Sequence, residues 1–277
     1  MIHIFYLVFS QLAVGGLGLL LIIPKGLVGR GFYRLMGSIY LLVMILTRFA
    51  NLAINRQPIS LKNFVFSWSG HDSAFVAAFL FLTLIYTISL WMKSQFISRG
   101  LLFIATILGV TWIVNSAQAY LGKIDLPAEA FLLPLQFLVS SVLLGAVNSG
   151  MWFGHWYLVT PRLPVVHLKR FNLIFLVSLV ISIALFALNL FLRWQSENAT
   201  PLTPFHHIVF SLRLLVGFGG SVILYFITWY CLREKAVEHD AVGATRAATG
   251  FLYVAMLTVF TGELCGRLLC LEIGFIL

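Results

Sequence analysis

Ionisable and amide side chains recur within long apolar stretches of this sequence, where each needs either a partner or a function. A charged group at the centre of a bilayer costs about 2.5–3.5 kcal/mol on insertion scales, so such residues mark functional sites or buried pairs. The candidates are Gln11, Arg48, His71, Asp72, Asn115, Gln118, His206, His207, Arg213, Glu263 and Arg267. Carboxylates and imidazoles can exchange protons with a bound substrate, and amides and guanidinium groups can donate hydrogen bonds to it.

Several of these residues also have a purely structural interpretation. Glu263 and Arg267 are four positions apart, so they could form an ion pair on one face of a helix. Arg48 and Arg213 could extend their guanidinium groups to a helix end or to the membrane interface. Asp72 could accept backbone N–H hydrogen bonds at the start of a helix. Spacing alone leaves both interpretations open.

The elements that must position these residues are long apolar helices. Hydrophobic residues make up 61% of the chain and charged residues 10%, against roughly 45–50% and about 25% in soluble domains. A membrane-spanning helix needs about 20 predominantly apolar residues. Apolar runs predict such helices at 2–24, 32–53, 72–93, 99–121, 130–160, 168–193, 205–232 and 247–275. We therefore predict an all-α integral membrane protein, a bundle of about eight transmembrane helices that forms a single domain over residues 1–277.

Basic residues are unevenly distributed between the connections, and this predicts an orientation. The first, third, fifth and seventh connections hold Lys25, Arg30, Arg34, Lys93, Arg99, Arg162, Lys169, Arg170, Arg233, Lys235 and Arg246. The opposite side holds chiefly Arg56, Lys62, Lys123 and Arg193. Because Lys and Arg collect in cytoplasmic loops, both termini are predicted on the non-cytoplasmic side of a bacterial cytoplasmic (inner) membrane, with membrane lipid around the helices. The excess of 18 Lys and Arg over 9 Asp and Glu follows from this topology and predicts no nucleic-acid partner.

This topology brings polar residues of six predicted helices to a similar depth, in the outer half of the membrane. Their convergence predicts a polar pocket or a docking surface near the outer face. No metal site is predicted, because Cys231, Cys265 and Cys270 form no CxxC pair and lie in or beside apolar runs. We expect these three cysteines to be small packing residues.

A second group of polar and aromatic residues lies at the predicted inner end of the fifth helix, in the segment GMWFGHWYLVTPRLP over 150–164. Trp152 and Trp156 are typical of an interfacial aromatic belt. His155 is a candidate haem ligand, but haem held by two histidines needs a second imidazole at matching depth. His167 is the candidate for it in that half, which keeps haem b as an alternative cofactor.

Two segments resemble the membrane anchor subunits of the dimethyl sulfoxide reductase and polysulfide reductase (NrfD-like) family. The first is IFYLVFSQLAVGGLGLLLIIP over 4–24, where a Phe-x-Gln step ending at Gln11 precedes Gly15 and Gly16. The second is LTVFTGELCGRLLCLEIG over 257–274, which contains a Gly-Glu-Leu-x-Gly-Arg element from Gly262 to Arg267. Together they cover about 40 residues at the two ends of the chain. The sequence departs from the family before the third helix, where His71 and Asp72 stand in place of its usual Asn-Glu pair.

The resemblance implies a divergent, quinone-interacting anchor subunit of a respiratory oxidoreductase complex. Such a subunit binds menaquinone or ubiquinone and relays electrons between the quinone pool and an iron–sulfur partner, itself joined to a catalytic subunit. On that hypothesis His71 and Asp72 are the expected catalytic residues for proton exchange. The expected hydrogen-bonding residues of the quinone pocket are Gln11, Arg48, Asn115 and Gln118. Glu263, Arg267 and Arg213 are expected to hold the last helix in place.

Three other functions remain open from the sequence. The first is a haem b-binding membrane cytochrome, with His155 as the candidate ligand. The second is a small-molecule transporter or permease, although the chain shows no inverted repeat of the kind common in transporters. The third is a structural scaffold for a larger complex.

Overall fold

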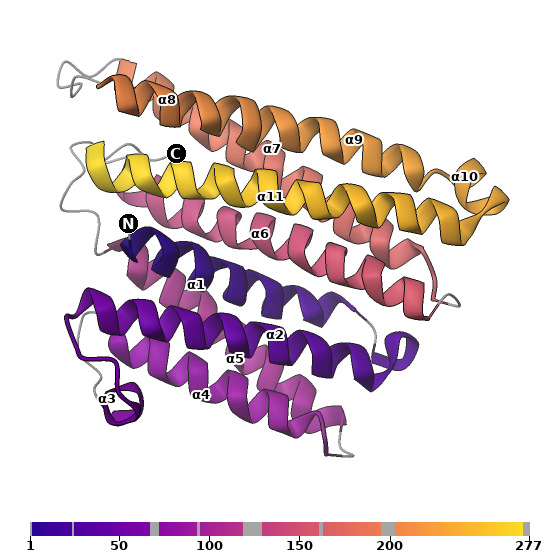
Figure 1. Ribbon diagram of the computed structural model, residues 1–277, viewed down its shortest axis with the longest axis horizontal. Helices are drawn as coiled ribbons and strands as arrows, with labels where there is room; N and C mark the ends of the chain where they lie inside the picture. The colour runs from indigo at the N-terminus through magenta and orange to yellow at the C-terminus, as the bar shows by residue number, and fades with distance from the viewer. Residues whose placement is uncertain are drawn as a thin grey trace.

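The computed structural model describes residues 2–23, 25–66, 72–92, 95–118, 129–160, 163–194 and 203–273, and these residues form helices joined by short connections without any strand. The elements are α1 (Ile2–Leu19), η1 (Leu20–Ile22), α2 (Lys25–Ile54), α3 (Leu61–Phe66), α4 (Ser73–Ser89), α5 (Gln95–Gln118), α6 (Glu129–Val159), α7 (Val166–Trp194), α8 (Pro204–Leu212), η3 (Arg213–Gly220), α9 (Ser221–Cys231), α10 (Glu234–His239) and α11 (Ala241–Ile273). The long helices lie side by side in one bundle (Figure 1).

Within the described residues, seven helical segments are long and apolar enough to cross a membrane. They are Ile2–Ile22, Val28–Ile54, Phe96–Gln118, Ala130–Val159, Val166–Leu192, Pro204–Cys231 and Ala241–Ile273. The eighth apolar helix, α4, has 17 residues and is about 25 Å long, against about 30 Å for a typical hydrocarbon core. The all-α multi-pass membrane character is therefore confirmed, while the number of crossings and their sidedness stay predictions.

The helix bounds broadly follow the predicted apolar runs, and two helices begin earlier than predicted. α11 begins at Ala241 rather than at 247, because the small and apolar residues that precede Thr245 and Arg246 continue the helix. α2 begins at Lys25 but bends at Gly29, whose φ of 75° lies in the left-handed region that favours glycine. Pro134 lies inside α6 without ending it, although it cannot donate the backbone hydrogen bond that residue 134 would otherwise make to the carbonyl of Ala130.

α1 and α6 form the centre of the bundle. In α1, 78% of the membrane-spanning window is buried, against 33% in the peripheral helices α5 and α7. Glycines allow the close approach, because a Cβ atom on Gly15 would collide with the backbone carbonyl of Ser141, and one on Gly145 with the backbone of Gly15. α2, α4 and α5 pack on one side of this pair, and α7, α9 and α11 pack on the other.

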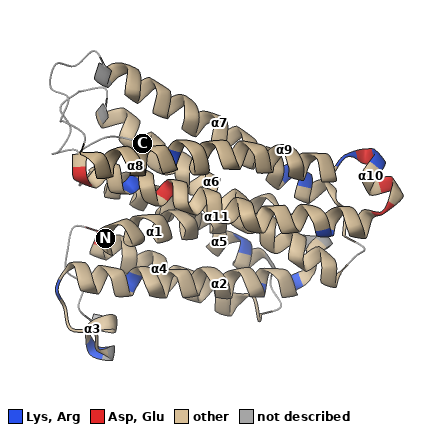
Figure 2. Cartoon of the chain, turned by 45° about the horizontal axis from the view of Figure 1, so that its top comes forward, with Lys and Arg blue, Asp and Glu red and all other residues tan. Residues whose placement is uncertain are grey.

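The first residues of α1 and the last residues of α11 lie at the same end of the bundle (Figure 1). We call this the outer end, following the predicted orientation, and the opposite end, which carries α10, the inner end. Figure 2 shows that charged residues are sparse along the helices and gather around α10. The few charged groups that lie within the bundle are therefore the main candidates for function.

Candidate functional site

Asp72 lies immediately before α4 at the outer end, where its half-buried carboxylate connects three helices. Its Oδ1 atom accepts a hydrogen bond of 2.7 Å from Nδ2 of Asn115 on α5. Its Oδ2 atom accepts bonds of 2.9 Å from the hydroxyl of Ser116 and 3.3 Å from the hydroxyl of Tyr6 on α1. We call Asp72, Tyr6, Asn115 and Ser116 the Asp72 network.

The network exists because Asp72 does not cap its own helix. It occupies the N-cap position of α4 but makes no side-chain capping hydrogen bond, in contrast to the structural interpretation above. The carboxylate turns to α1 and α5 instead, and the three donors that contact it are neutral groups. These three hydrogen bonds orient the half-buried carboxylate toward α1 and α5.

Aromatic residues lie beneath the Asp72 network. The Tyr6 ring meets the fully buried Trp112 edge to face, with 6.2 Å between ring centroids. Trp112 in turn packs against Phe79 of α4 at 5.5 Å. The network is therefore polar toward the outer end and apolar toward the membrane interior.

A second polar cluster lies deeper, between α6, η3 and α11. Glu263 accepts a hydrogen bond of 2.9 Å from Nη1 of Arg213 at Oε1, and one of 3.3 Å from Nη2 of Arg267 at Oε2. The same Nη2 atom donates to Ser140 at 2.6 Å. The three charged side chains are 0–1% exposed. We call Arg213, Glu263 and Arg267 the buried triad.

A glycine contact places Arg213 in the buried triad. η3 is a π-helical segment, a widened turn that often occurs at functional sites. Gly217 of η3 packs directly on Gly262 of α11, since a Cβ atom built on Gly217 would lie 2.8 Å from the Gly262 Cα atom. This approach brings Arg213, one turn before Gly217, against Glu263, one residue after Gly262. Arg213 therefore lies inside the bundle rather than at the membrane interface.

The buried triad carries one more positive than negative charge. Arg267 lies over the Phe137 ring at 4.0 Å, and Arg213 over the Phe218 ring at 4.5 Å, so each aromatic face offsets part of that charge. Even so, Nε and Nη2 of Arg213 and Nε and Nη1 of Arg267 have no hydrogen-bond partner within the described part of the chain. The triad is enclosed by protein on all sides, since its three side chains are 0–1% exposed.

Gln11 lies on α1 and is fully buried, with neither amide atom bonded to any described residue. α1 and α6 run in the same direction, and Gly15 packs on Ser141. Gln11, one turn before Gly15, therefore lies near the depth of Phe137, one turn before Ser141. This places Gln11 near the level of the buried triad and deeper than the Asp72 network.

Arg48 is fully buried and connects α2 to the short helix α3. Its Nε and Nη2 atoms donate to the backbone carbonyls of Phe64 and Asn63 at 3.2 and 2.8 Å. Its Nη1 atom donates to Asn51 at 2.7 Å. These bonds direct the guanidinium group toward the connection between α2 and α4, so Arg48 fastens α3 to the bundle.

The remaining predicted residues are dispersed. Gln118 is exposed at the end of α5, one turn beyond Asn115 and Ser116. His71 lies outside the described residues. His206 contacts Glu272 at 3.1 Å on the outer surface, and His207 is exposed. Of the predicted site residues that the structure describes, Asp72 and Asn115 are brought together at the outer end, and Arg213, Glu263 and Arg267 in the interior.

The two histidines considered for haem lie on different sides of α6. His167 is buried, and its ring meets Phe153 of α6 at 6.0 Å. His155 is exposed and contacts the Tyr253 hydroxyl at 3.5 Å. Two residues along a helix correspond to a rotation of about 200°, so Phe153 and His155 point in opposite directions. This geometry does not favour haem ligation by this pair.

Comparison with known proteins adds no relative: no protein-family model, no curated protein and no solved structure matches this chain. The described residues also contain no group of three or more His, Cys, Asp or Glu side chains that could hold a metal ion. The function of the candidate site must therefore be inferred from the geometry of its residues.

Sequence reasoning missed the hydroxyl groups of both clusters. Tyr6 and Ser116 complete the Asp72 network, and Ser140 binds Arg267. Ser and Tyr are common in membrane helices, so they do not stand out in an apolar run as ionisable and amide side chains do. A useful signal for Ser116 was its position directly after Asn115, on the part of α5 already predicted to face the polar region.

Proposed function

We propose that this chain is a quinone-interacting anchor subunit of a respiratory oxidoreductase complex, and that Asp72 exchanges protons with the quinone head near the outer end. The observation that carries the proposal is the half-buried Asp72 carboxylate, which accepts hydrogen bonds from Tyr6, Asn115 and Ser116 above an apolar aromatic layer. The resemblance of the segments around Gln11 and Glu263 to NrfD-like anchors supports the same function.

Oxidation of a quinol releases two protons and two electrons. Asp72 accepts a proton from a quinol hydroxyl and passes it to water at the outer end, while Tyr6, Asn115 and Ser116 keep the carboxylate oriented. The electrons pass to an iron–sulfur centre in a partner subunit, and menaquinone or ubiquinone is the mobile carrier. His71, next to Asp72 in the sequence, is the second proposed proton-exchanging residue.

The buried triad has a supporting role in this proposal. Glu263 is bonded to both arginines, so it stays ionised and does not exchange protons with the quinone. The triad instead joins η3 and α11 to α6, and α6 holds the central helix α1 that carries Tyr6. The triad therefore helps the Asp72 network to keep its geometry while protons enter and leave.

The proton-exchange role is tested by quinol oxidation in membranes that contain the native complex. The Asp72→Asn variant keeps a hydrogen-bonding side chain but loses the proton acceptor, so we expect a fall in turnover of about 10²–10⁴-fold with retained binding of a fluorescent quinone analogue. Asp240→Asn, on the exposed α10 region at the inner end, is the matched control and should leave turnover unchanged. Full turnover in Asp72→Asn would contradict the proposal.

The anchor assignment is tested by purification from native membranes in mild detergent, with subunit identification by mass spectrometry and a visible spectrum of the same sample. Co-purification of an iron–sulfur subunit and a catalytic subunit, without haem bound to this chain, is the expected result. A Soret band assigned to this chain would favour the haem b cytochrome instead. A solitary, colourless protein that binds no quinone would favour a transporter or a scaffold.

A further inference from the structure

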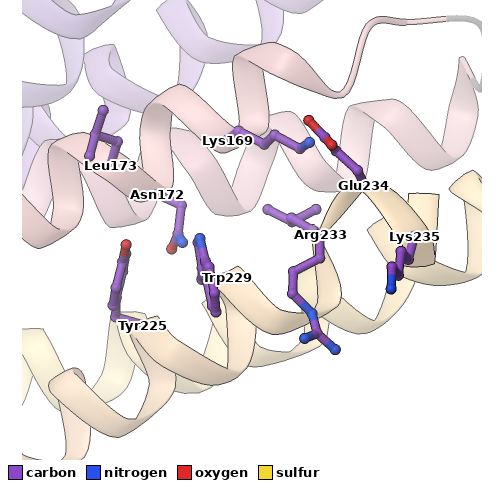
Figure 3. A pocket seen from close by; sticks show the side chains of 9 residues that line it. Lys169, Asn172, Leu173, Tyr225, Trp229, Arg233, Glu234 and Lys235 are labelled. Carbon is purple, nitrogen blue, oxygen red and sulfur yellow. The ribbon is translucent and has the colours of Figure 1, made fainter. Parts of the chain in front are cut away.

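A cavity of about 570 Å³ lies at the inner end, between α7, α9 and the start of α10, and the proposed function does not use it. Its lining residues are Lys169, Asn172, Leu173, Tyr225, Trp229, Leu232, Arg233, Glu234 and Lys235 (Figure 3). The volume is within the range of small-ligand sites, which is about 300–1,000 Å³. We call it the inner cavity.

The inner cavity has an excess of positive charge. Three basic residues and one acidic residue line it, and Figure 3 shows Lys169 of α7 and Glu234 of α10 pointing toward one another. The Arg233 guanidinium lies 3.5 Å from the centre of the Tyr230 ring and points away from α7. Lys235 also points away from Lys169 in this view, so what favours an anion is the overall balance of three basic side chains against one acidic side chain around the cavity.

Asn172 provides a second, independent feature. Its side chain is 3% exposed and points from α7 toward Trp229 on α9 (Figure 3). Its Oδ1 atom is buried and accepts no hydrogen bond from any described residue. A buried amide oxygen of this kind needs a donor, because it has lost its hydrogen bond to water without gaining another. A ligand hydroxyl in the inner cavity would supply one.

An apolar groove of about 340 Å³ lies next to the inner cavity, between α6 and α7. Leu173, which is 55% exposed, lines both hollows. The groove follows α7 from Leu173 to Ile181, a length of about 12 Å at 1.5 Å per residue. Its one polar lining residue, Ser178, donates its hydroxyl to the Ile174 carbonyl, so it offers the groove no donor.

We propose that the inner cavity and the groove together bind one anionic phospholipid with a hydroxylated head, of the phosphatidylglycerol class. The phosphate lies near Lys169 and Lys235, a head-group hydroxyl donates to Asn172 Oδ1, and an acyl chain follows the groove past Leu173. Trp229, half-exposed at the mouth, takes the interfacial position that is typical of tryptophan. The site lies at the end predicted to face the cytoplasm, where basic pockets between helices bind lipid heads.

The selectivity follows from the three features. The excess of positive charge favours an anionic lipid over phosphatidylcholine, which is zwitterionic. The Asn172 oxygen favours a hydroxylated head over phosphatidic acid, whose head has no alcohol. The groove favours a lipid over free inorganic phosphate, which has no acyl chain.

The test uses the purified, delipidated full-length chain, titrated with short-chain phosphatidylglycerol, phosphatidylcholine, phosphatidic acid or inorganic phosphate and followed by native mass spectrometry. We expect phosphatidylglycerol to bind at least tenfold more tightly than phosphatidylcholine. The double variant Lys169→Gln/Lys235→Gln should lose about thirtyfold in affinity, at about 1 kcal/mol for each basic residue. Lys62→Gln, an exposed lysine on α3 at the outer end, is the matched control and should change nothing.

Two further variants test recognition of the lipid head group and of the lipid acyl chain separately. Asn172→Leu should remove the preference for phosphatidylglycerol over phosphatidic acid, and Val177→Phe should block the groove and weaken lipid binding. Equal affinity of the unaltered protein for phosphatidylglycerol and phosphatidylcholine would overturn the proposal even if every variant failed to fold. Inorganic phosphate that displaces the lipid head, with Val177→Phe without effect, would identify a free-phosphate site instead and overturn it equally.

Discussion

The Asp72 network and the buried triad stabilise a carboxylate in opposite ways. Asp72 is half-buried at the outer end and receives its three described hydrogen bonds from neutral donors on α1 and α5. Glu263 is fully buried and receives its bonds from two arginines on η3 and α11. Both kinds of donor favour the ionised carboxylate, and a paired cation favours it more strongly than a neutral hydrogen-bond donor does.

Because of this difference, we expect the two clusters to affect different properties of the protein, one its stability and the other its activity. Loss of one member of a buried ion cluster leaves an uncompensated charge in a low-dielectric interior, so the buried triad should dominate stability. Loss of the Asp72 charge leaves neutral groups that can bond to one another or to water. The Asp72 network should therefore dominate function while contributing little to stability, and substitutions in the two clusters can break or sharpen this comparison.

The largest effect is expected for Glu263→Ala. It leaves Arg213 and Arg267 buried without a counter-charge, so we expect a loss of about 3–5 kcal/mol of stability and little folded protein in detergent. Size-exclusion chromatography and thermal unfolding measure it. Glu272→Ala, on the same helix but 45% exposed, is the control and should unfold close to the unaltered protein.

A replacement of the whole buried triad sharpens this result. Because apolar residues of similar volume often substitute for a buried ion cluster without loss, Arg213→Met/Glu263→Leu/Arg267→Met should recover most of the stability that Glu263→Ala loses. A triple variant as unstable as Glu263→Ala would show that the arginines contribute more than charge compensation.

Gly262→Ala is expected to have the next largest effect. Its Cβ atom would lie 2.7 Å from the Gly217 Cα atom, so η3 and α11 must separate, and Arg213 would move from Glu263. Overpacking of this kind costs about 1–3 kcal/mol, measured as a lower unfolding temperature. Gly250→Ala lies on the same helix with no atom within 4 Å of the new Cβ, and it should not destabilise the protein.

The sequence predicted the helices well because membrane insertion depends on length and hydropathy, which are local properties. The apolar runs near 130–160 and 168–193 match α6 and α7 within two residues at each end. The π-helical segment Arg213–Gly220 could not be predicted, since the wide turn depends on the contact between Gly217 and Gly262 of another helix. The short helices α3 and α10 lie in polar connections, where periodicity is weak.

The candidate site was only partly predictable, because depth along a helix is local but helix neighbours are not. Asp72 and Asn115 were both placed near the outer face, and the structure brings them together. Arg48 was placed at a similar depth, yet its guanidinium turns to the backbone of α3. Which side of the bundle each polar residue faces depends on packing between helices, and the sequence contains no direct record of it.

Asp72→Asn is expected to lower stability by about 1 kcal/mol or less. The amide retains an acceptor and can rearrange its bonds with Asn115, Ser116 and Tyr6, so no charge is left buried without a partner. Thermal unfolding of this variant, beside that of Glu263→Ala, tests the comparison directly. A loss as large as that of Glu263→Ala would mean that the Asp72 network is structural and would count against its catalytic role.

The smallest effect on the whole bundle is expected for Arg48→Gln, although Arg48 is as buried as the triad. Three of its hydrogen bonds lead to Asn51 of its own helix and to the backbone of α3, a helix of six residues that packs against α2. Gln is too short to reach both backbone carbonyls, so α3 should detach while α1 and α6 stay packed. Hydrogen exchange should accelerate over residues 61–66, with the unfolding temperature nearly unchanged. Global destabilisation would instead show that the attachment of α3 by Arg48 supports the whole bundle.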